Sequence, residues 1–290
     1  MPGETKRQDK HALTLRPVGV TAGLAVVTAL GWAVVVDRRG AAMGMGMGMG
    51  MGMGKGVEMR TGMGTGGVDA AAFLGVWVAM VAAMMLPTIQ PMVVTYRALF
   101  RDDLTRTRWS RMAAFLVPYA VLWMIAGTGA LGLWSIGRDH PVVAGSLVAI
   151  AGLYQLGTIK TRCLRWCRSP LGFLVRFGGN ARSMRGAAAL GTRHGAVCFG
   201  CCAGLMVGLT GAGVMSISWL VALGLLMLLE KTHRAGQSLA KMSGVALLAL
   251  GAATAVVPFG QLTSEATGLG AIAVLGIVAL ATRRRIFAVA

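Results

Sequence analysis

Long apolar runs alternate along this chain with short gaps that hold most of its charged residues. A bilayer core needs about 20 apolar residues per helical crossing, and most of the runs come close to or exceed that length. Backbone polar groups must find partners within the chain in lipid, so the pattern predicts α-helices. We expect eight apolar helical segments, at residues 18–36, 71–95, 112–134, 141–158, 194–212, 214–229, 241–258 and 266–282.

The predicted fold class is all-α, a polytopic transmembrane bundle of seven to eight helices. The eighth segment is short and contains Gly, and the fifth and sixth should form a hairpin around Gly211 and Gly213. The expected organisation is an N-terminal tail (1–17), a first membrane helix (18–36), a Met- and Gly-rich loop (37–69), a core bundle with the candidate site motifs (70–258), and a last short helix with a basic tail (259–290).

Composition supports a membrane protein over a soluble domain. Mean hydropathy is +0.68 and only 13% of the residues are charged, which is far from the usual soluble composition. The net charge of +18 would suit nucleic acid. However, the basic residues lie in gaps between apolar runs and leave no folded basic domain, so we expect no nucleic-acid binding.

The basic residues also predict an orientation. Most Lys and Arg fall in the two tails and in the gaps after the second, fourth and sixth segments, which share one side of an eight-helix bundle. Cytoplasmic loops are enriched in Lys and Arg, so both termini should be cytoplasmic. We expect a multi-pass protein of the bacterial cytoplasmic membrane. The opposite side holds Arg38, Arg39, Lys55, Arg60 and Arg138.

Residues 43–54 read MGMGMGMGMGMG, and the predicted topology places them outside the cytoplasm. Thioethers are soft ligands that prefer Cu(I), and the intervening Gly would let the chain wrap an ion. A flexible low-complexity linker is the alternative.

A second group of Met lies on the second apolar segment. Met80 and Met84 are four residues apart and share a helix face, Met85 adjoins them, and Pro87 should kink the helix. A soft-ion site is one interpretation. Ordinary core packing is the other, and it is the simpler one for this helix taken alone.

Four candidate ligands begin the fifth segment: His194, Cys198, Cys201 and Cys202. At about 100° per residue they fall within an arc of roughly 100° on one helix. Thiolate and imidazole ligands select Cu(I), Zn(II) or an iron–sulfur cluster. Redox thiols and buried packing residues are the alternatives. One helix cannot close a metal shell alone, so a second segment must contribute.

Two further cysteines lie on the same predicted side of the membrane. Cys163 and Cys167 are four residues apart and share a face if their segment is helical, so they are candidates to complete the set. Glu230 ends the sixth apolar segment. It is a candidate ligand or proton relay, or else an interfacial charge that reaches the membrane surface.

These motifs together resemble a bacterial family of predicted metal-binding integral membrane proteins of unknown function. The resemblance covers about residues 70–250 and is carried by WVAMVAAMMLPTIQP (77–91), YQLGTIKTRCLRWCRSPLGF (154–173), RHGAVCFGCC (193–202) and LLEK (228–231). The family often has His just before the second of these two cysteines, whereas this chain has Trp166 there, so one possible ligand is missing. The resemblance implies metal-site roles for Met80, Met84, Met85, Cys163, Cys167, His194, Cys198, Cys201, Cys202 and Glu230.

The leading functional hypothesis is a membrane protein that binds a soft transition metal for transport or for delivery to a membrane metalloenzyme or metallochaperone. Cu(I) is favoured, with Zn(II) or iron as alternatives. A membrane oxidoreductase and a structural subunit of a membrane complex are the rival hypotheses. Since no nucleotide motif, carboxylate pair or Ser-His-Asp arrangement is present, an enzyme is the weaker prediction.

Overall fold

The structure is a computed structural model that describes residues 18–46, 70–100, 105–137, 140–211, 217–253 and 267–277. All regular secondary structure in these ranges is helical, as the apolar pattern predicts. An unlabelled helix, Thr267–Ile277, follows the labelled ones. The labelled helices are α2 (Val18–Gly46), α3 (Ala70–Ala98), α4 (Thr105–Gly137), α5 (Pro141–Leu156), α6 (Thr158–Cys167), α7 (Pro170–Phe177), α8 (Met184–Gly211), α9 (Ile217–Thr232) and α10 (Gly236–Ala253).

Proline and glycine set several helix boundaries. α5 and α7 each begin with Pro at the first helical position, where its missing N–H costs nothing. Gly157 has an extended conformation between α5 and α6, and the chain bends by 64° there. α3, by contrast, continues as one helix through Pro87 and Pro91.

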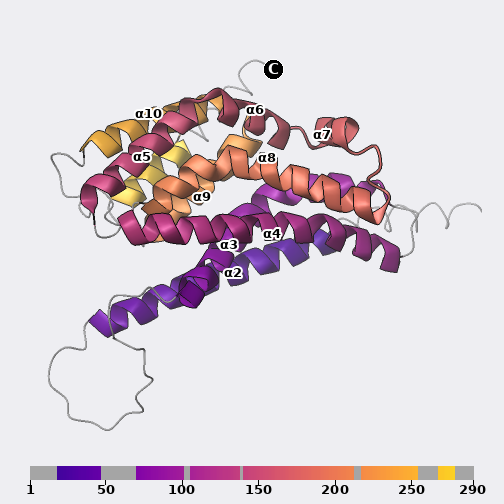
Figure 1. Cartoon of the computed structure of the whole chain (residues 1–290), viewed down its shortest axis with the longest axis horizontal. Coiled ribbons are helices and arrows are strands. Elements are labelled where there is room, and N and C mark those ends of the chain that lie inside the picture. The colour runs from indigo at the N-terminus through magenta and orange to yellow at the C-terminus, as the bar shows by residue number, and fades with distance from the viewer. Residues whose placement is uncertain are drawn as a thin grey trace, which may run out of the picture.

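α8 lies in the middle of the bundle and packs against α4, α5 and α6 (Figure 1). Glycine permits these close approaches, because a side chain would separate the helices. A Cβ at Gly191 of α8 would collide with the carbonyl of Phe115 on α4. Elsewhere, a Cβ at Gly152 of α5 would lie 2.7 Å from the Gly244 carbonyl oxygen on α10. The helix that carries the predicted cysteine cluster is therefore held on several sides.

Three described helices are long and apolar enough to cross a membrane: Phe73–Ala98, Arg106–Leu133 and Met184–Leu209. The bent pair Val142–Leu156 and Thr158–Cys167 makes a fourth if it counts as one span. The larger number of crossings and the cytoplasmic placement of both termini stay predictions. The first residues of the Met-Gly run, 43–46, form the end of α2. The rest of the run, residues 47–54, lies outside the described residues.

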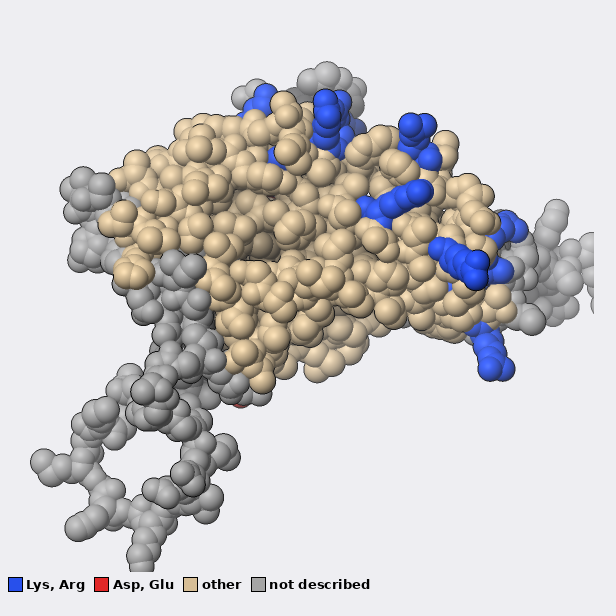
Figure 2. All heavy atoms as spheres, in the orientation of Figure 1, with Lys and Arg blue, Asp and Glu red and all other residues tan. Residues whose placement is uncertain are grey.

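The surface is divided by chemistry. Large apolar side chains are exposed on α2, α4 and α5, among them Leu30, Ile125 and Val142. Figure 2 shows the Lys and Arg side chains of the visible face gathered toward one end and one edge of the molecule, near α6, α7 and the start of α8 in Figure 1. This is the distribution expected of a membrane bundle with one basic side.

Candidate metal centre

Three cysteine sulfurs meet on one side of α8. Cys198, Cys201 and Cys202 are each 1% exposed, and their sulfur atoms all lie within 4.8 Å of one another. Residues three and four apart are neighbours on a helix surface, which explains why this spacing converges the side chains. The structure thus brings together the three sulfurs that the sequence placed on one helix face.

α6 supplies a fourth sulfur. The Sγ of Cys167 lies 3.4 Å from the Sγ of Cys201, which in turn lies 3.5 Å from the Sγ of Cys202. α6 reaches this position because the bend at Gly157 turns it across α8. α6 is therefore the second segment that a metal site on α8 requires.

Cys163, one turn earlier on α6, has a different environment. Its sulfur packs against α8, where a Cβ at Gly200 would lie 2.6 Å away. Trp166, at the position where His is frequent in the resembling family, packs its ring against Phe173 and Phe177 of α7. Within the described residues, neither Cys163 nor Trp166 makes a hydrogen bond to the sulfur atoms of Cys167, Cys198, Cys201 and Cys202. We call these four residues the thiol cluster.

A buried lysine faces the thiol cluster. The Nζ of Lys231 donates to the Sγ of Cys198 at 3.3 Å and to the hydroxyl of Thr88 at 2.9 Å. The hydroxyl of Tyr119 lies 3.4 Å from the same sulfur. A neighbouring ammonium favours the thiolate form of cysteine, which is the form that binds metal. The site therefore carries its own compensating positive charge.

His194 lies one turn before Cys198 and is 4% exposed. Its ring is surrounded by Phe115, Tyr119 and Phe173, with ring centroids 6.0, 6.2 and 5.2 Å away. Its Nδ1 is buried and has no hydrogen-bond partner within the described part of the chain. An imidazole with an unused nitrogen one turn from Cys198 is a candidate metal ligand. Among the described residues, however, the ligand atoms that lie within 4.8 Å of one another are the three cysteine sulfurs of α8 and not a nitrogen of His194.

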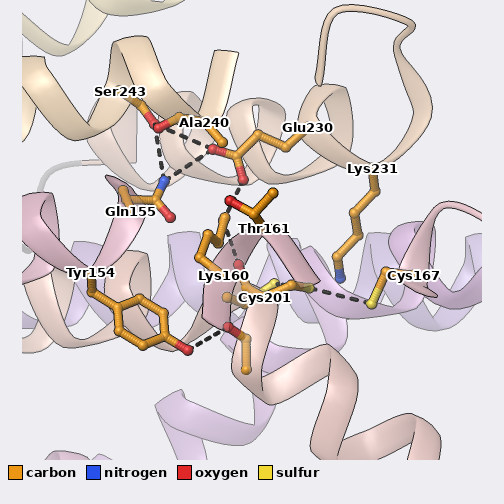
Figure 3. A network of polar contacts seen from close by, with 12 residues as sticks. Tyr154, Gln155, Lys160, Thr161, Cys167, Cys201, Glu230, Lys231, Ala240 and Ser243 are labelled. Carbon is orange, nitrogen blue, oxygen red and sulfur yellow. Dashed lines mark hydrogen bonds and ion pairs between the residues drawn. The ribbon is translucent and has the colours of Figure 1, made fainter. Parts of the chain in front are cut away.

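A second polar network supports the thiol cluster from behind. Lys160 is fully buried and pairs with Glu230, with Nζ 2.6 Å from Oε2. The same ammonium donates to the backbone carbonyl of Cys201, so it ties Glu230 to the cluster-bearing turn of α8 (Figure 3). Gln155 and Ser243 also donate to Glu230, at 3.0 and 3.3 Å.

Glu230 therefore has a defined place. It is 1% exposed, which rules out the interfacial-charge interpretation of the sequence. Its carboxylate oxygens face Lys160, Gln155 and Ser243 rather than the sulfurs. The structure separates it from the thiol cluster by the Lys160 side chain (Figure 3).

The three candidate methionines of α3 are buried. Met80, Met84 and Met85 are 7%, 3% and 0% exposed. The Met85 carbonyl accepts a hydrogen bond from Thr88, which contacts Lys231. Met85 is thus linked to the site through Thr88, whereas the four sulfurs that meet are all cysteine.

The sulfur spacing suits a shared metal ion. A thiolate sulfur lies about 2.3 Å from Zn(II), so two sulfurs on one ion of that size are at most about 4.6 Å apart. The three sulfurs of α8 lie within 4.8 Å of one another, close to this limit, and the sulfurs of Cys201 and Cys202 are 3.5 Å apart. A family model described as PpoB2, copper chaperone, matches residues 74–254. The chain belongs to this family. No curated protein and no solved structure matched it.

The copper chaperone family match covers every element that builds the site, from α3 to α10. Sequence reasoning missed the site's two lysines, because Lys160 and Lys231 read as members of basic cytoplasmic gaps, and it gave no signal for Thr88, Tyr119, Gln155 or Ser243. In the structure the two lysines are 0% and 7% exposed. The sequence did contain a signal for Lys231, which follows Glu230 at the end of an apolar run. Ionisable groups at membrane depth are costly unless they have partners, so this pair could have been predicted to be buried and paired.

Proposed function

We propose that this protein is a polytopic membrane copper chaperone that holds Cu(I) at the thiol cluster and passes it to a copper-using membrane enzyme. The observation that carries the proposal is the meeting of Cys198, Cys201 and Cys202 with Cys167 from a separate helix. Membership of a copper chaperone family supports copper as the cargo.

The chemistry of the ligands also favours Cu(I). Thiolate sulfur and imidazole bind soft ions, and the burial of Cys198, Cys201 and Cys202 limits the water that would stabilise harder ions. Delivery requires that ligands exchange one at a time. Because Cys167 belongs to α6 and the other three cysteines to α8, a movement of α6 would remove one ligand without disturbing the rest.

A location in the bacterial cytoplasmic membrane is part of the proposal. Three long apolar helices, a fourth bent candidate and exposed apolar side chains support membrane insertion. The thiol cluster lies between α6 and the middle of α8, and both α6 and the first turns of α8 carry basic residues of the gap that the positive-inside rule places in the cytoplasm. The recipient is then a membrane metalloenzyme, or a metallochaperone on that side.

Copper content of the purified full-length chain tests this proposal. Protein prepared anaerobically in detergent should retain about one copper ion per chain, as thiolate sites bind soft ions tightly. The variant Cys198→Ser, Cys201→Ser, Cys202→Ser should lose it while Cys163→Ser keeps it. Equal copper in the wild type and the triple variant would overturn the proposal.

A thiol oxidoreductase is the second candidate, and the 3.4 Å separation of the Cys167 and Cys201 sulfurs favours it. Such an enzyme would cycle between dithiol and disulfide and would need no metal. The same preparation distinguishes the two candidates. Absence of copper, together with a disulfide that forms reversibly between these cysteines, would favour the oxidoreductase.

A further inference from the structure

Buried methionines line the seam where α3, α8 and α9 meet. Lys231 of α9 contacts both Thr88 of α3 and Cys198 of α8, so the three helices converge at the level of the thiol cluster. Each of the three helices carries a buried methionine within two or three turns of that level. They are Met84 on α3, Met206 on α8 and Met227 on α9. Neither the sequence motifs nor the family description assigns the methionines of α8 and α9 to a site.

Contacts on α9 place two of these thioethers together. Gly224, Met227 and Lys231 fall within an arc of about 60° on the helix, so they share one face. A Cβ at Gly224 would lie 3.4 Å from Cγ of Met84. Met84 therefore packs on the face of α9 that carries Met227, and the two side chains are 3% and 1% exposed.

Helical spacing extends the row on the other two helices. Met206 follows Cys202 by four residues on α8 and is 2% exposed, and Met80 precedes Met84 by four on α3. Residues four apart lie on one face with an axial rise of about 6 Å. Met206 therefore extends the Cys202 face of α8 by one turn, and Met80 extends the Met84 face of α3 by one turn.

We propose that Met80, Met84, Met206 and Met227, the thioether ladder, form a second Cu(I) site that relays the ion to the thiol cluster. This rests on the proposed function, in which the cluster is the resting place of copper. Thioethers are soft and uncharged, so they bind Cu(I) without releasing a proton and more weakly than thiolates do. The ion therefore moves toward the cluster, where binding displaces thiol protons and the copper stays Cu(I).

The ladder also accounts for the choice of side chain. Leucine fills a comparable volume and packs as well in an apolar seam, so packing alone does not require sulfur at these four buried positions. A copper relay does require sulfur at these positions, because sulfur is the atom that binds Cu(I). Substitution by leucine consequently removes the ligand atoms while it preserves the packing.

The first test removes the thiol cluster and measures the ladder alone. The full-length variant in which all five cysteines are replaced by Ser, so that no thiol remains, is titrated anaerobically with Cu(I) supplied as its acetonitrile complex, and X-ray absorption reports the sulfur neighbours. We expect a weak sulfur-coordinated Cu(I) that disappears when Met84→Leu, Met206→Leu and Met227→Leu are added. Met112→Leu on α4, at 3% exposure, is the matched control and should retain the ion.

The second test keeps the cluster and measures loading. The Met84→Leu, Met206→Leu, Met227→Leu variant should reach the wild-type copper content but load about tenfold more slowly, a change of the size that supporting residues make at metal sites. Wild-type loading rates, or no sulfur-bound Cu(I) in the cluster-free variant, would overturn the relay. Failure of the proposed function has a different signature. In that case the wild type and the Cys198→Ser, Cys201→Ser, Cys202→Ser variant would contain equal amounts of copper.

Discussion

At the scale of single residues, the most informative side chain is Lys231. Its ammonium contacts the Cys198 sulfur and stabilises the thiolate charge inside an apolar bundle. We expect Lys231→Met to weaken Cu(I) binding by about 10- to 100-fold, the usual effect of removing a group that supports a metal ligand. Competition with a Cu(I) chelator of known affinity measures this change.

Two further variants make the Lys231 prediction specific. Lys231→Arg keeps the positive charge and should recover part of the affinity, although its planar fork cannot reproduce both contacts of the ammonium. Lys241→Met removes an exposed charge from the next helix and should leave affinity unchanged. Wild-type affinity in Lys231→Met would show that the cluster needs no neighbouring cation.

The buried pair of Lys160 and Glu230 leads to a different expectation. Glu230→Gln leaves the Lys160 ammonium buried without a carboxylate, which costs about 3–5 kcal/mol for a broken buried ion pair. The thermal midpoint of the detergent-solubilised protein should fall. The double variant Lys160→Met, Glu230→Gln should recover much of that loss, because no unpaired charge remains.

The same double variant separates support from ligation. If Glu230 positions Lys160 and the Cys201 carbonyl, the double variant should retain copper at wild-type stoichiometry. A stable double variant without copper would instead assign Glu230 as a ligand. Copper content and the thermal midpoint are measured on the same preparation.

At the scale of helices, the docking of α6 on α8 decides which cysteines act together. Cys163 and Cys167 are one turn apart on α6, yet only Cys167 has its sulfur 3.4 Å from Cys201. We expect Cys167→Ser to weaken Cu(I) binding and Cys163→Ser to leave it near the wild-type value. Chelator competition on the two single variants checks this, and equal losses would contradict the geometry.

Helix-scale features also show what the sequence could and could not predict. Apolar runs located α5 closely, at 141–158 predicted against Pro141–Leu156, because helix periodicity and length are local properties. Spacing placed Cys198, Cys201 and Cys202 on one face for the same reason. The choice of Cys167 over Cys163 depends on the bend at Gly157 and on packing between distant segments, which local patterns do not encode.

Buried lysines were missed for a related reason. In a sequence, Lys160 sits among Arg162 and Arg165 and is indistinguishable from a solvated basic gap. Its partner Glu230 lies 70 residues away. Only the packed bundle shows that one lysine of this gap turns inward while the neighbouring arginines stay exposed.

At the scale of the whole molecule, surface chemistry and the thiol cluster point to the same orientation. Exposed apolar side chains cover α2, α4 and α5, and the basic residues gather toward one end and one edge (Figure 2). The thiol cluster is built beside these basic segments, from α6 and α8. An ion entering along the thioether ladder would therefore travel toward the basic side.

Reporter fusions test this orientation in a bacterial host. The positive-inside rule predicts that a fluorescent protein fused to either end of the chain is fluorescent and that alkaline phosphatase fused there is inactive, since the first works in the cytoplasm and the second outside it. Insertion of the same reporters between residues 60 and 65, in the segment that follows the Met-Gly run, should give the reverse pattern. Active phosphatase at the C-terminus would place the basic tail outside. The thiol cluster would then face the wrong side for a cytoplasmic recipient, and delivery would have to run outward.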